Sequence, residues 1–520
     1  MQKTTEPLNE AALRLFGVPR LYPYQRLVAA NILDAAKAAG IALDWAGGAQ
    51  SRAQREDARA GFCEDPSDGE RHGRQIVILP TGAGKSLCFQ LPAMIMEGIT
   101  LVVYPILSLM ADQKRKLDEL GLAPVVLRGG QDKEERGEVW RKLESGESKF
   151  VISNPETLLA PQVARRLAGG RLGGRRVAHV VIDEAHCVGE WGESFRPAYL
   201  EIGAILESVA PPLVTAFTAT AGAAVLEKIR GYVFGGRETR LVMGNPDRAN
   251  VSYFAQGCVA RNLAARDLLL RNARPAIVFC STRGGAETLA RYLRTALRET
   301  RADWRGEIRF YHAGLSREEK DDAEKWFMAS SGAVLCATCA FGMGVDKPDI
   351  RTVIHRDCPP SVEAYLQESG RAGRDGRSAK AFLLWGPDDA AILRRAKKDA
   401  DEARLSALLS YARDATRCRR QALLELLDCG AGGLEPRDSC CDVCDARASP
   451  GLREEASLID FFRRNKRRYA TGEAARALSR SEGPFWSEDE ARQAINHLVG
   501  VGRLARSGNF FWKGALSVAD

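Results

Sequence analysis

RQIVILPTGAGKSLCFQLPA, residues 74–93, is the stretch that decides the fold, because an apolar strand runs directly into a glycine-containing loop and then into an apolar helix. In that order, backbone N–H groups at the start of the helix can cradle phosphate groups. Leu79 stands at the first glycine position of the longer form of this motif, so the loop alone is also compatible with a structural turn. The loop residues that we expect to bind a nucleotide are Thr81, Gly82, Ala83, Gly84, Lys85 and Ser86.

Two of these side chains have specific roles in such a loop. The Lys85 ammonium offsets the charge of the β- and γ-phosphates, and the Ser86 hydroxyl is a ligand for Mg²⁺. A second apolar strand, VAHVVI, ends in Asp183, Glu184 and His186. We expect Asp183 to hold Mg²⁺ and Glu184 to orient or deprotonate the attacking water. His186 is expected to link this site to the parts of the molecule that move.

Short apolar runs of strand length alternate with helical patterns from about residue 73 to 385, which is typical of parallel sheets covered by helices. The runs are RQIVILP, ITLVVYP, KFVISNP, VAHVVIDEAH, LVTAFTAT, PAIVFCS, GAVLCAT, RTVIHRD and AKAFLLW. The series breaks at GNPDRANVSY, residues 244–253. We therefore predict an α/β chain with two tandem parallel-sheet domains, a helical module and a short C-terminal domain, over residues 1–243 (with an insertion at about 36–72), 244–386, 387–446 and 447–520.

The composition fits a multidomain globular protein, with 520 residues, 45% hydrophobic and 27% charged. A net charge of +8 is compatible with a polyanionic partner without requiring one. The N-terminus lacks the layout of a secretory signal, and the stretch from Gln90 to Met110 carries Glu97 and is interrupted by Pro92 and Pro105. Thirteen cysteines without a signal favour reduced thiols or a metal site over disulfides. We expect a cytoplasmic protein that has no membrane contact.

A third element, QESGRAGRDG, occupies residues 367–376 in the second α/β region. Gln367 opens it, and Arg371 and Arg374 follow on glycine-spaced backbone. Guanidinium groups are suited to contact a γ-phosphate, so we expect these arginines to reach a nucleotide held by the first domain. Hydrolysis would then be coupled to opening and closing of a cleft.

With these elements in order, the chain resembles the RecQ family of superfamily-two DNA helicases from about Leu13 to Cys444. The blocks that carry the resemblance are FGVPRLYPYQ, TGAGKSLCFQLPA, VVYPILSLMADQ, VISNPETLL, DEAHCVGEWGESFRPAY, FTATA, VFCSTR, YHAGLSREEK, ATCAFGMGVDKPDIRTVIH and QESGRAGRDG. The resemblance implies two RecA-like domains and an ATP- and Mg²⁺-dependent DNA helicase that moves 3′-to-5′ on single strands and unwinds duplex DNA in repair or recombination. It implies single-stranded and forked duplex DNA as partners.

The resemblance also implies roles for individual residues. In the adenine motif Gln25 occupies the glutamine position, Tyr22 is positioned to stack on a base, and Val18 replaces an aromatic residue common in the family. Asp346 joins the nucleotide-binding residues. Each small polar residue among the implied DNA contacts also has a plainer interpretation as a helix cap or turn former. The implied DNA contacts are Ser153, Asn154, Trp191, Phe195, Arg196, Thr218, Thr220, His312 and Thr338.

A cysteine cluster follows the second α/β region. Cys418 precedes RDSCCDVC, which contains Cys440, Cys441 and Cys444. A C-x-x-C pair with a distant cysteine fits tetrahedral thiolate coordination of Zn²⁺, and the cluster resembles the zinc module of the family. Adjacent ligands are strained, so Cys429 stays open as an alternative to Cys440, and Asp438 is a weaker one.

The C-terminal segment predicts three amphipathic helices and an aromatic, basic hairpin, which together indicate a short winged helix. A basic run at residues 463–468 is expected to meet DNA phosphates, with Arg467 as the representative contact. Phe510, Phe511 and Trp512 are candidates for a strand-separating wedge. The shortness of this segment leaves a DNA-stimulated translocase without processive unwinding as an alternative, and a noncatalytic nucleic-acid-binding regulator as a remote one.

Overall fold

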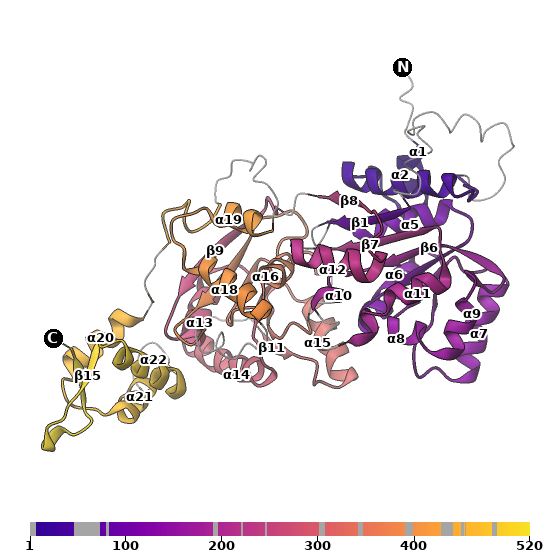
Figure 1. Ribbon diagram of the computed structural model, residues 1–520. Coiled ribbons are helices and arrows are strands. Elements are labelled where there is room, and N and C mark those ends of the chain that lie inside the picture. Colours follow the sequence, from indigo (N-terminus) through magenta and orange to yellow (C-terminus); the bar gives the residue numbers. More distant parts are fainter. Residues whose placement is uncertain are drawn as a thin grey trace. The chain divides into compact units, whose positions relative to one another are not determined.

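The computed structural model divides into two compact units, Met1–Pro246 and Asp247–Asp520 (Figure 1). The division lies close to the boundary predicted after residue 243. Each unit is built around a parallel sheet with helices on its faces. The structure describes residues 7–45, 73–79, 83–190, 196–219, 222–244, 247–300, 307–341, 347–389, 399–427, 440–448, 452, 454–480 and 486–519.

The first unit contains a sheet in the order β3-β4-β2-β6-β7-β1-β8, with β5 paired to β6. The paired strands of the main path are parallel. β2 and β7 are buried along their whole length, which is why they appear in the sequence as continuous apolar runs. The strands are β1 Arg74–Ile78, β2 Ile99–Val103, β3 Val125–Val126, β4 Phe150–Ser153, β5 Arg171–Leu172, β6 Arg175–Ile182, β7 Leu213–Thr218 and β8 Arg240–Met243.

Helices cover this sheet, and their buried side chains form one core with the strands. Of the insertion predicted at about 36–72, the structure describes residues 36–45, in which α2 continues to Ala38 and the Asp44 N–H donates to the Ile95 carbonyl at 2.7 Å. Residues up to 45 therefore belong to the fold. The helices are α1 Pro7–Phe16, α2 Pro23–Ala38, α5 Lys85–Ile95, α6 Leu107–Glu119, α7 Lys133–Glu144, α8 Pro155–Leu158, α9 Pro161–Leu167, α10 Cys187–Glu190, η2 Pro197–Tyr199, α11 Ile202–Val209 and α12 Ala223–Phe234.

The second unit begins with an all-parallel sheet in the order β11-β12-β10-β13-β14-β9. Alternate residues of β9 enter different cores: Tyr253 packs on one face of the sheet and Phe254 on the other. The elements are β9 Val251–Gly257, α13 Arg261–Arg271, β10 Ala276–Phe279, α14 Arg283–Thr300, β11 Ile308–Tyr311, α15 Arg317–Ala329, β12 Val334–Ala337, β13 Thr352–His355, α16 Val362–Ser369 and β14 Ala379–Trp385.

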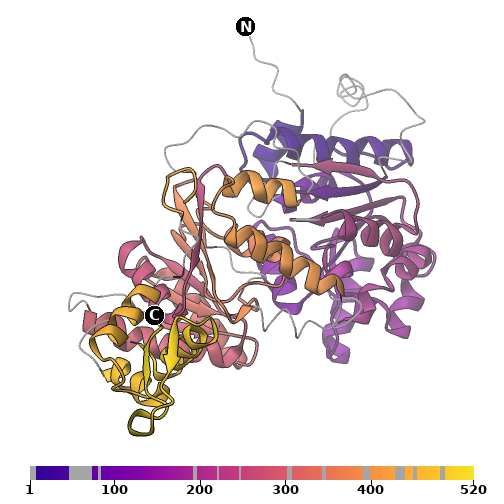
Figure 2. The same cartoon turned by 60° about the vertical axis from the view of Figure 1, so that its left-hand side comes forward.

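Two small modules complete the second unit. In the first, α18 Asp399–Arg413 packs against β9 and β14, and α19 Arg419–Leu426 leads to the cysteine cluster (Figure 2). The second has its own core around Leu458, Phe462 and Leu498, with the predicted order of three helices and a hairpin. Its elements are α20 Glu455–Arg464, α21 Thr471–Arg480, α22 Glu488–Gly500, β15 Leu504–Arg506, η3 Phe510–Trp512 and β16 Leu516–Val518.

The α/β prediction of two tandem parallel-sheet domains is confirmed. Each apolar run predicted as a strand forms one, whereas β3, β5, β8, β9 and β11 were not predicted. Among the helices that the structure describes, none combines the length and the apolar character needed to cross a bilayer.

Candidate nucleotide and nucleic-acid sites

The phosphate loop meets α5 at Gly84, which has φ +70° and is the residue before the helix. The left-handed backbone conformation favours glycine, and a Cβ atom there would lie 2.6 Å from Gln25 Nε2 and displace that side chain. Lys85 and Ser86 are the first two residues of α5 and are half-buried. Thr81 and Gly82 lie outside the described residues.

Gln25 is bound to the backbone of this loop. Its Nε2 donates to the Ala83 carbonyl at 3.0 Å, and its Oε1 accepts from the Tyr22 N–H at 3.0 Å. Tyr24, which the sequence analysis did not single out, also donates to the Ala83 carbonyl, at 3.3 Å. Tyr22 is 61% exposed and stacks on Tyr24 with ring centroids 5.5 Å apart. The predicted nucleotide-binding residues Tyr22, Gln25, Ala83 and Gly84 are therefore neighbours.

The acidic residues after β6 lie beside Lys85. Lys85 Nζ is 3.8 Å from Glu184 Oε1, and Glu184 Oε2 is 3.4 Å from His186 Nδ1. The same His186 nitrogen lies 3.1 Å from the Thr218 hydroxyl at the end of β7. Glu184 adopts φ +51°, a conformation that costs energy for a residue with a side chain and that is concentrated at functional sites.

Asp183 is buried at the same sheet edge, and its Oδ1 accepts the Glu184 N–H at 2.9 Å. Burial and the neighbouring Glu184 charge raise the pKa of Asp183 to about 6, and the Lys85 charge opposes this shift. A buried carboxylate beside a half-buried one favours an added cation, so Asp183 suits the predicted role of Mg²⁺ ligand. Ser86, the other predicted ligand, lies in the first turn of α5. The structure thus brings Lys85, Asp183, Glu184 and His186 together, as the sequence analysis expected.

Most of the implied DNA-contact residues use their polar atoms within the protein. The Ser153 hydroxyl donates to the Leu127 carbonyl at 2.9 Å, and His312 Nε2 lies 2.9 Å from Glu287 Oε1. Thr338, like Thr218, is buried. Arg196 Nη1 lies 3.6 Å from Glu156 Oε1. These contacts join distant segments and are neither helix caps nor turns, so the DNA roles stay predictions. Trp191, Phe195 and Thr220, like the predicted nucleotide-binding residue Asp346, lie outside the described residues.

Asn154 caps a helix and also lines a cavity. Its Oδ1 accepts the Thr157 N–H at 3.2 Å and so caps α8, and Asn154 also lines a cavity of about 370 Å³. Arg128 and Arg136 line the same cavity, and the sequence analysis missed them. The only signal in the sequence was a glycine-containing charged segment, LRGGQDKEER, directly after the short β3; its acidic and basic residues balance, so its charge did not mark the two arginines. Two guanidinium groups beside an amide suit a sugar-phosphate backbone.

The arginine-containing turn follows α16 in the second unit. Ser361 caps α16 by accepting the Ala364 N–H at 3.2 Å, and Gln367 is half-buried on this helix. Arg371 is buried and Arg374 is half-buried. The structure therefore places Gln367, Arg371 and Arg374 in one helix and its C-terminal turn.

The four sulfur atoms of Cys418, Cys440, Cys441 and Cys444 lie within 4.8 Å of one another. Cys418 Sγ and Cys440 Sγ are 3.6 Å apart. A tetrahedral site with Zn–S bonds of about 2.3 Å has S–S edges of roughly 3.8 Å, so the four thiols fit a zinc ion. Of the two candidates for the fourth ligand, Cys440 is in this cluster, and Cys429 lies outside the described residues.

The C-terminal module exposes the predicted basic and aromatic residues. Arg467 and its basic neighbours at the end of α20 are exposed. On the hairpin, Phe511 is 84% and Trp512 50% exposed. Phe510 begins the short helix η3 in the same hairpin.

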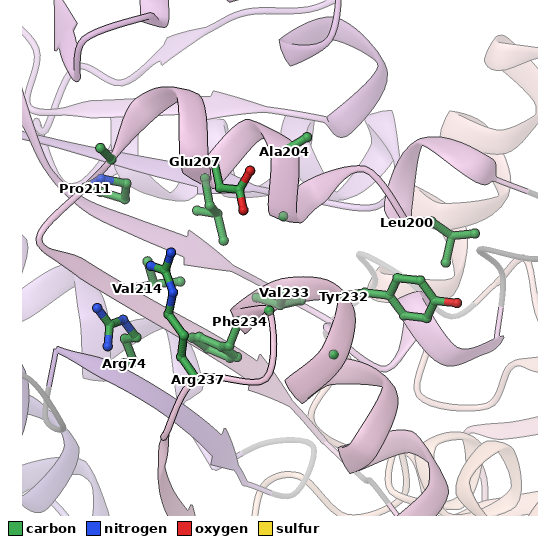
Figure 3. Close-up of a pocket in the computed structure, with 15 residues that line it drawn as sticks. Arg74, Leu200, Ala204, Glu207, Pro211, Val214, Tyr232, Val233, Phe234 and Arg237 are labelled. Carbon is green, nitrogen blue, oxygen red and sulfur yellow. The ribbon is translucent and has the colours of Figure 1, made fainter.

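A separate cavity of about 450 Å³ lies at the opposite edge of the first sheet (Figure 3). Arg74, Glu207 and Arg237 extend toward it from different elements. Arg74 begins β1, whereas the phosphate loop follows the end of that strand, and a five-residue strand spans roughly 16 Å. This cavity is therefore distinct from the nucleotide residues.

Comparison with known proteins agrees with this arrangement. Residues 69–229 match the family described as DEAD/DEAH box helicase, and residues 260–376 match the helicase conserved C-terminal domain. The solved structure of the helicase MrfA bound to DNA has a TM-score of 0.54 at 16% identity, and covers 100% of this chain and 60% of that one. Mss116 bound to single-stranded RNA also has a TM-score of 0.54, at 15% identity, over 95% of this chain and 90% of that one. At such identity these two structures show the shared fold alone.

Curated relatives are closer in sequence. RecQ-like DNA helicase blm-1 of Caenorhabditis elegans is 34% identical over 74% of this chain and 40% of its own length. ATP-dependent DNA helicase RecQ of Haemophilus influenzae is 32% identical over 74% of this chain, and the match spans 60% of that protein. The RecQ of Bacillus subtilis is 32% identical over 78% of this chain and 68% of its own length. The chain belongs to the RecQ family of superfamily-two helicases.

Proposed function

We propose that this chain is an ATP- and Mg²⁺-dependent DNA helicase that moves 3′-to-5′ along a single strand and unwinds duplex DNA in repair or recombination. The observation that carries the proposal is the chain of contacts from Lys85 through Glu184 and His186 to Thr218 at the carboxyl edge of the first sheet. In parallel α/β sheets this edge is where ligands bind. RecQ proteins of several organisms that resemble this chain are named ATP-dependent DNA helicases.

Each residue of this edge has a proposed task. Lys85 binds the β- and γ-phosphates, and Ser86 and Asp183 would hold Mg²⁺, which would offset the charge of the phosphates. Glu184 takes the proton of the attacking water or orients that water. When ATP occupies Lys85, the ammonium group gains a phosphate partner, so Glu184 is released toward the water. Arg371 and Arg374 act on the γ-phosphate during turnover.

The proposed DNA partner is single-stranded or forked duplex DNA. The exposed basic residues at the end of α20 meet backbone phosphates, and Arg128 and Arg136 with Asn154 provide a second phosphate contact. The highly exposed Phe511 supports a wedge role for the hairpin, because a ring on a hairpin tip can stack on the last base pair of a duplex. The alternative is translocation without processive unwinding. It requires the same ATPase residues but assigns no function to the Phe511 ring.

Zinc is proposed for the four-cysteine cluster. Cys418, Cys440, Cys441 and Cys444 would hold the ion, which would crosslink α19 to the segment after it. The cysteines that the structure describes are all free, which agrees with a reducing, cytoplasmic location.

The test is ATP hydrolysis and forked-duplex unwinding with and without single-stranded DNA. Glu184→Gln is expected to lower kcat by about 10²–10⁴ while ATP binding is retained, since only the proton transfer is lost. Lys85→Ala is expected to lower ATP affinity as well. Glu207→Gln is the matched control, because Glu207 lies at the cavity on the opposite sheet edge.

Hydrolysis without strand separation on any fork would support the translocase alternative. Hydrolysis that is insensitive to Glu184→Gln and Lys85→Ala would overturn the proposed site. Stimulation by single-stranded RNA that equals stimulation by DNA would overturn DNA as the specific partner.

A further inference from the structure

Arg248, in the segment that leads into β9, is bound to the backbone of the arginine-containing turn. Its Nη1 donates to the Gly370 carbonyl at 2.9 Å. Its Nη2 donates to the carbonyls of Ala372 at 3.2 Å and Gly373 at 3.1 Å. These carbonyls surround Arg371, so one guanidinium group contacts the backbone on both sides of it. A planar guanidinium with several N–H donors is suited to fix such a turn.

Asn250, two residues after Arg248, contacts the same turn. Its Nδ2 donates to the Gly373 carbonyl at 2.6 Å and to the Arg377 carbonyl at 2.8 Å. Gly373 has φ +57°, and a Cβ atom there would lie 2.4 Å from Asn250 Nδ2. Because Gly373 has no Cβ atom, the Asn250 amide can approach the backbone of the turn that carries Arg371 and Arg374.

The residue before Arg248 joins this segment to the cysteine module. Asp247 pairs with Arg420 of α19, and Arg420 Nε lies 2.8 Å from Asp247 Oδ1. The Arg420 side chain is 1% exposed. Its Nη1 lies 3.8 Å from Cys440 Sγ, one of the four clustered sulfur atoms. Burial makes the pair sensitive to the position of each partner, because a buried charge that loses its partner is costly.

A second buried pair fixes the cysteine module to β9 itself. Arg419 Nε lies 2.9 Å from Asp442 Oδ1, and Asp442 Oδ2 accepts the Ala255 N–H at 3.1 Å. The Tyr253 N–H donates to the Cys440 carbonyl at 3.3 Å. The cysteine cluster is thus held directly against the strand that the Asp247–Asn250 segment enters.

We propose that Arg248 is a positioning residue for the arginine-containing turn, and that the Arg420–Asp247 pair connects the metal-binding cysteine cluster to it. A cation held by the four sulfur atoms fixes Cys440, which fixes Arg420 and, through Asp247, the backbone at Arg248. The effect on ATP hydrolysis rests on the proposed function, because it requires Arg371 and Arg374 to act on the nucleotide. The connection itself is a continuous chain of contacts within the second unit.

The connection predicts behaviour that a merely stabilising role does not. Amide hydrogen exchange of residues 370–377 reports the turn directly, since the Gly373 N–H donates to the Ile350 carbonyl at 2.8 Å. Removing Zn²⁺ with a chelator is expected to speed exchange there in the wild-type chain. In Asp247→Asn, exchange is expected to be fast already with Zn²⁺ bound and to change little when Zn²⁺ is removed. Zinc content per chain, measured with a chelating dye, is expected to be the same in both.

Kinetics supply the second measurement. Arg248→Ala is expected to lower kcat by about 10- to 100-fold with little change in the KM for ATP, because a displaced arginine fails in the transition state more than in binding. Arg248→Lys is expected to recover part of this loss. Arg294→Ala is the matched control, since Arg294 also donates to a backbone carbonyl, that of Ile308 at 2.8 Å, on the same sheet but away from the turn.

Exchange at residues 370–377 that is unaffected by both zinc removal and Asp247→Asn would overturn the connection, whatever the ATPase activity. If Arg248→Ala had an unchanged kcat while Glu184→Gln, assayed in parallel, lost hydrolysis, the positioning role would be overturned and the proposed function would stand. Absence of hydrolysis in the wild type would overturn the proposed function, and the exchange measurement would still decide the connection.

Discussion

The two parallel sheets hold charged residues at their edges in different ways. In the first sheet Lys85 and His186 both contact Glu184, so the position of this carboxylate depends on neighbouring side chains. In the second unit the turn with Arg371 and Arg374 is held by its own carbonyl groups, which accept from Arg248 and Asn250. The first arrangement should therefore change when a nucleotide replaces one partner, and the second should keep its shape whatever the charge of its arginines.

Replacing Arg374 gives the largest expected effect and tests the second half of this comparison. Arg374→Ala is expected to lower kcat by about 10³–10⁵, the usual contribution of an arginine that contacts the transferred phosphoryl group. The midpoint of thermal unfolding is expected to stay the same, because the bonds that fix the turn use backbone carbonyls. Coupled ATPase assays with single-stranded DNA and a thermal melt measure both quantities.

Arg377→Ala serves as the control, because Arg377 is exposed just beyond the turn. A fall in kcat of less than tenfold in Arg374→Ala would remove this arginine from the site. A large fall in the unfolding midpoint would instead show that the turn depends on its own arginine, contrary to the comparison.

The candidate nucleotide-binding residues of the first sheet could be grouped from the sequence because they are local. A phosphate loop needs a strand, a glycine and a lysine within a few residues, and Asp183 to His186 directly follow the apolar strand β6. The strands that were predicted are buried apolar runs, whereas β3 and β5 contain two residues each and β11, Ile308–Tyr311, alternates apolar and polar positions. Pattern alone carries little signal for such short or mixed strands.

The contacts of the arginine-containing turn could not be predicted in the same way. Arg420 and Asp247 are 173 residues apart, and Arg248 and Gly370 are 122 residues apart. No spacing rule joins such pairs, and a lone arginine in the sequence is more often at the surface. The same limit applies to Ser153, whose hydroxyl is used by the Leu127 carbonyl of a neighbouring segment.

A buried histidine in each sheet allows a further test by pH. His179 on β6 lies 2.9 Å from the neutral Thr215 hydroxyl, whereas His355 on β13 lies 2.9 Å from the Glu368 carboxylate. Burial lowers the pKa of His179 from 6.5 to about 3. Below pH 6.5 this histidine binds a proton in the unfolded chain but not in the folded chain, so its contribution to the stability of the first unit falls as the pH falls.

Between pH 7 and pH 5 the loss contributed by His179 is about 2 kcal/mol, at 1.36 kcal/mol per pH unit below 6.5. The raised pKa of Asp183 acts in the opposite direction over this range, so the His179 contribution is the difference between the wild type and His179→Gln. Native-state hydrogen exchange of the β6 and β7 amides measures it, and His355→Gln is expected to leave the pH dependence of the first unit unchanged. If the wild type and His179→Gln changed in parallel between pH 7 and pH 5, the effect would belong to other groups.

The smallest expected effect concerns how the C-terminal module attaches to the second sheet. Glu490 of α22 accepts the Asn262 N–H at 2.6 Å in the first turn of α13, and Leu263 of α13 lies in the core of the C-terminal module. Burial raises the pKa of Glu490 above 4.5, and the hydrogen bond from Asn262 opposes this shift. The folded state therefore favours the protonated acid, so this contact is most stable below pH 4.5 and weakens as the pH rises through the raised pKa.

Glu490→Gln keeps an oxygen that accepts the Asn262 N–H and removes the buried charge. The attachment of the variant is expected to be independent of pH, with a difference from the wild type of at most about 1 kcal/mol at neutral pH, because the favourable position of the carboxylate at a helix N-terminus offsets much of its burial cost. Exchange of the amides at residues 262–264 measures the attachment. Glu488→Gln is the control, since Glu488 pairs with Arg492 on the exposed side of α22. If Glu490→Gln opened the contact at every pH, the Glu490 charge itself would hold the C-terminal module. The attachment would then resemble the first sheet, where side-chain charges interact, more than the arginine-containing turn, where backbone carbonyl groups accept the bonds.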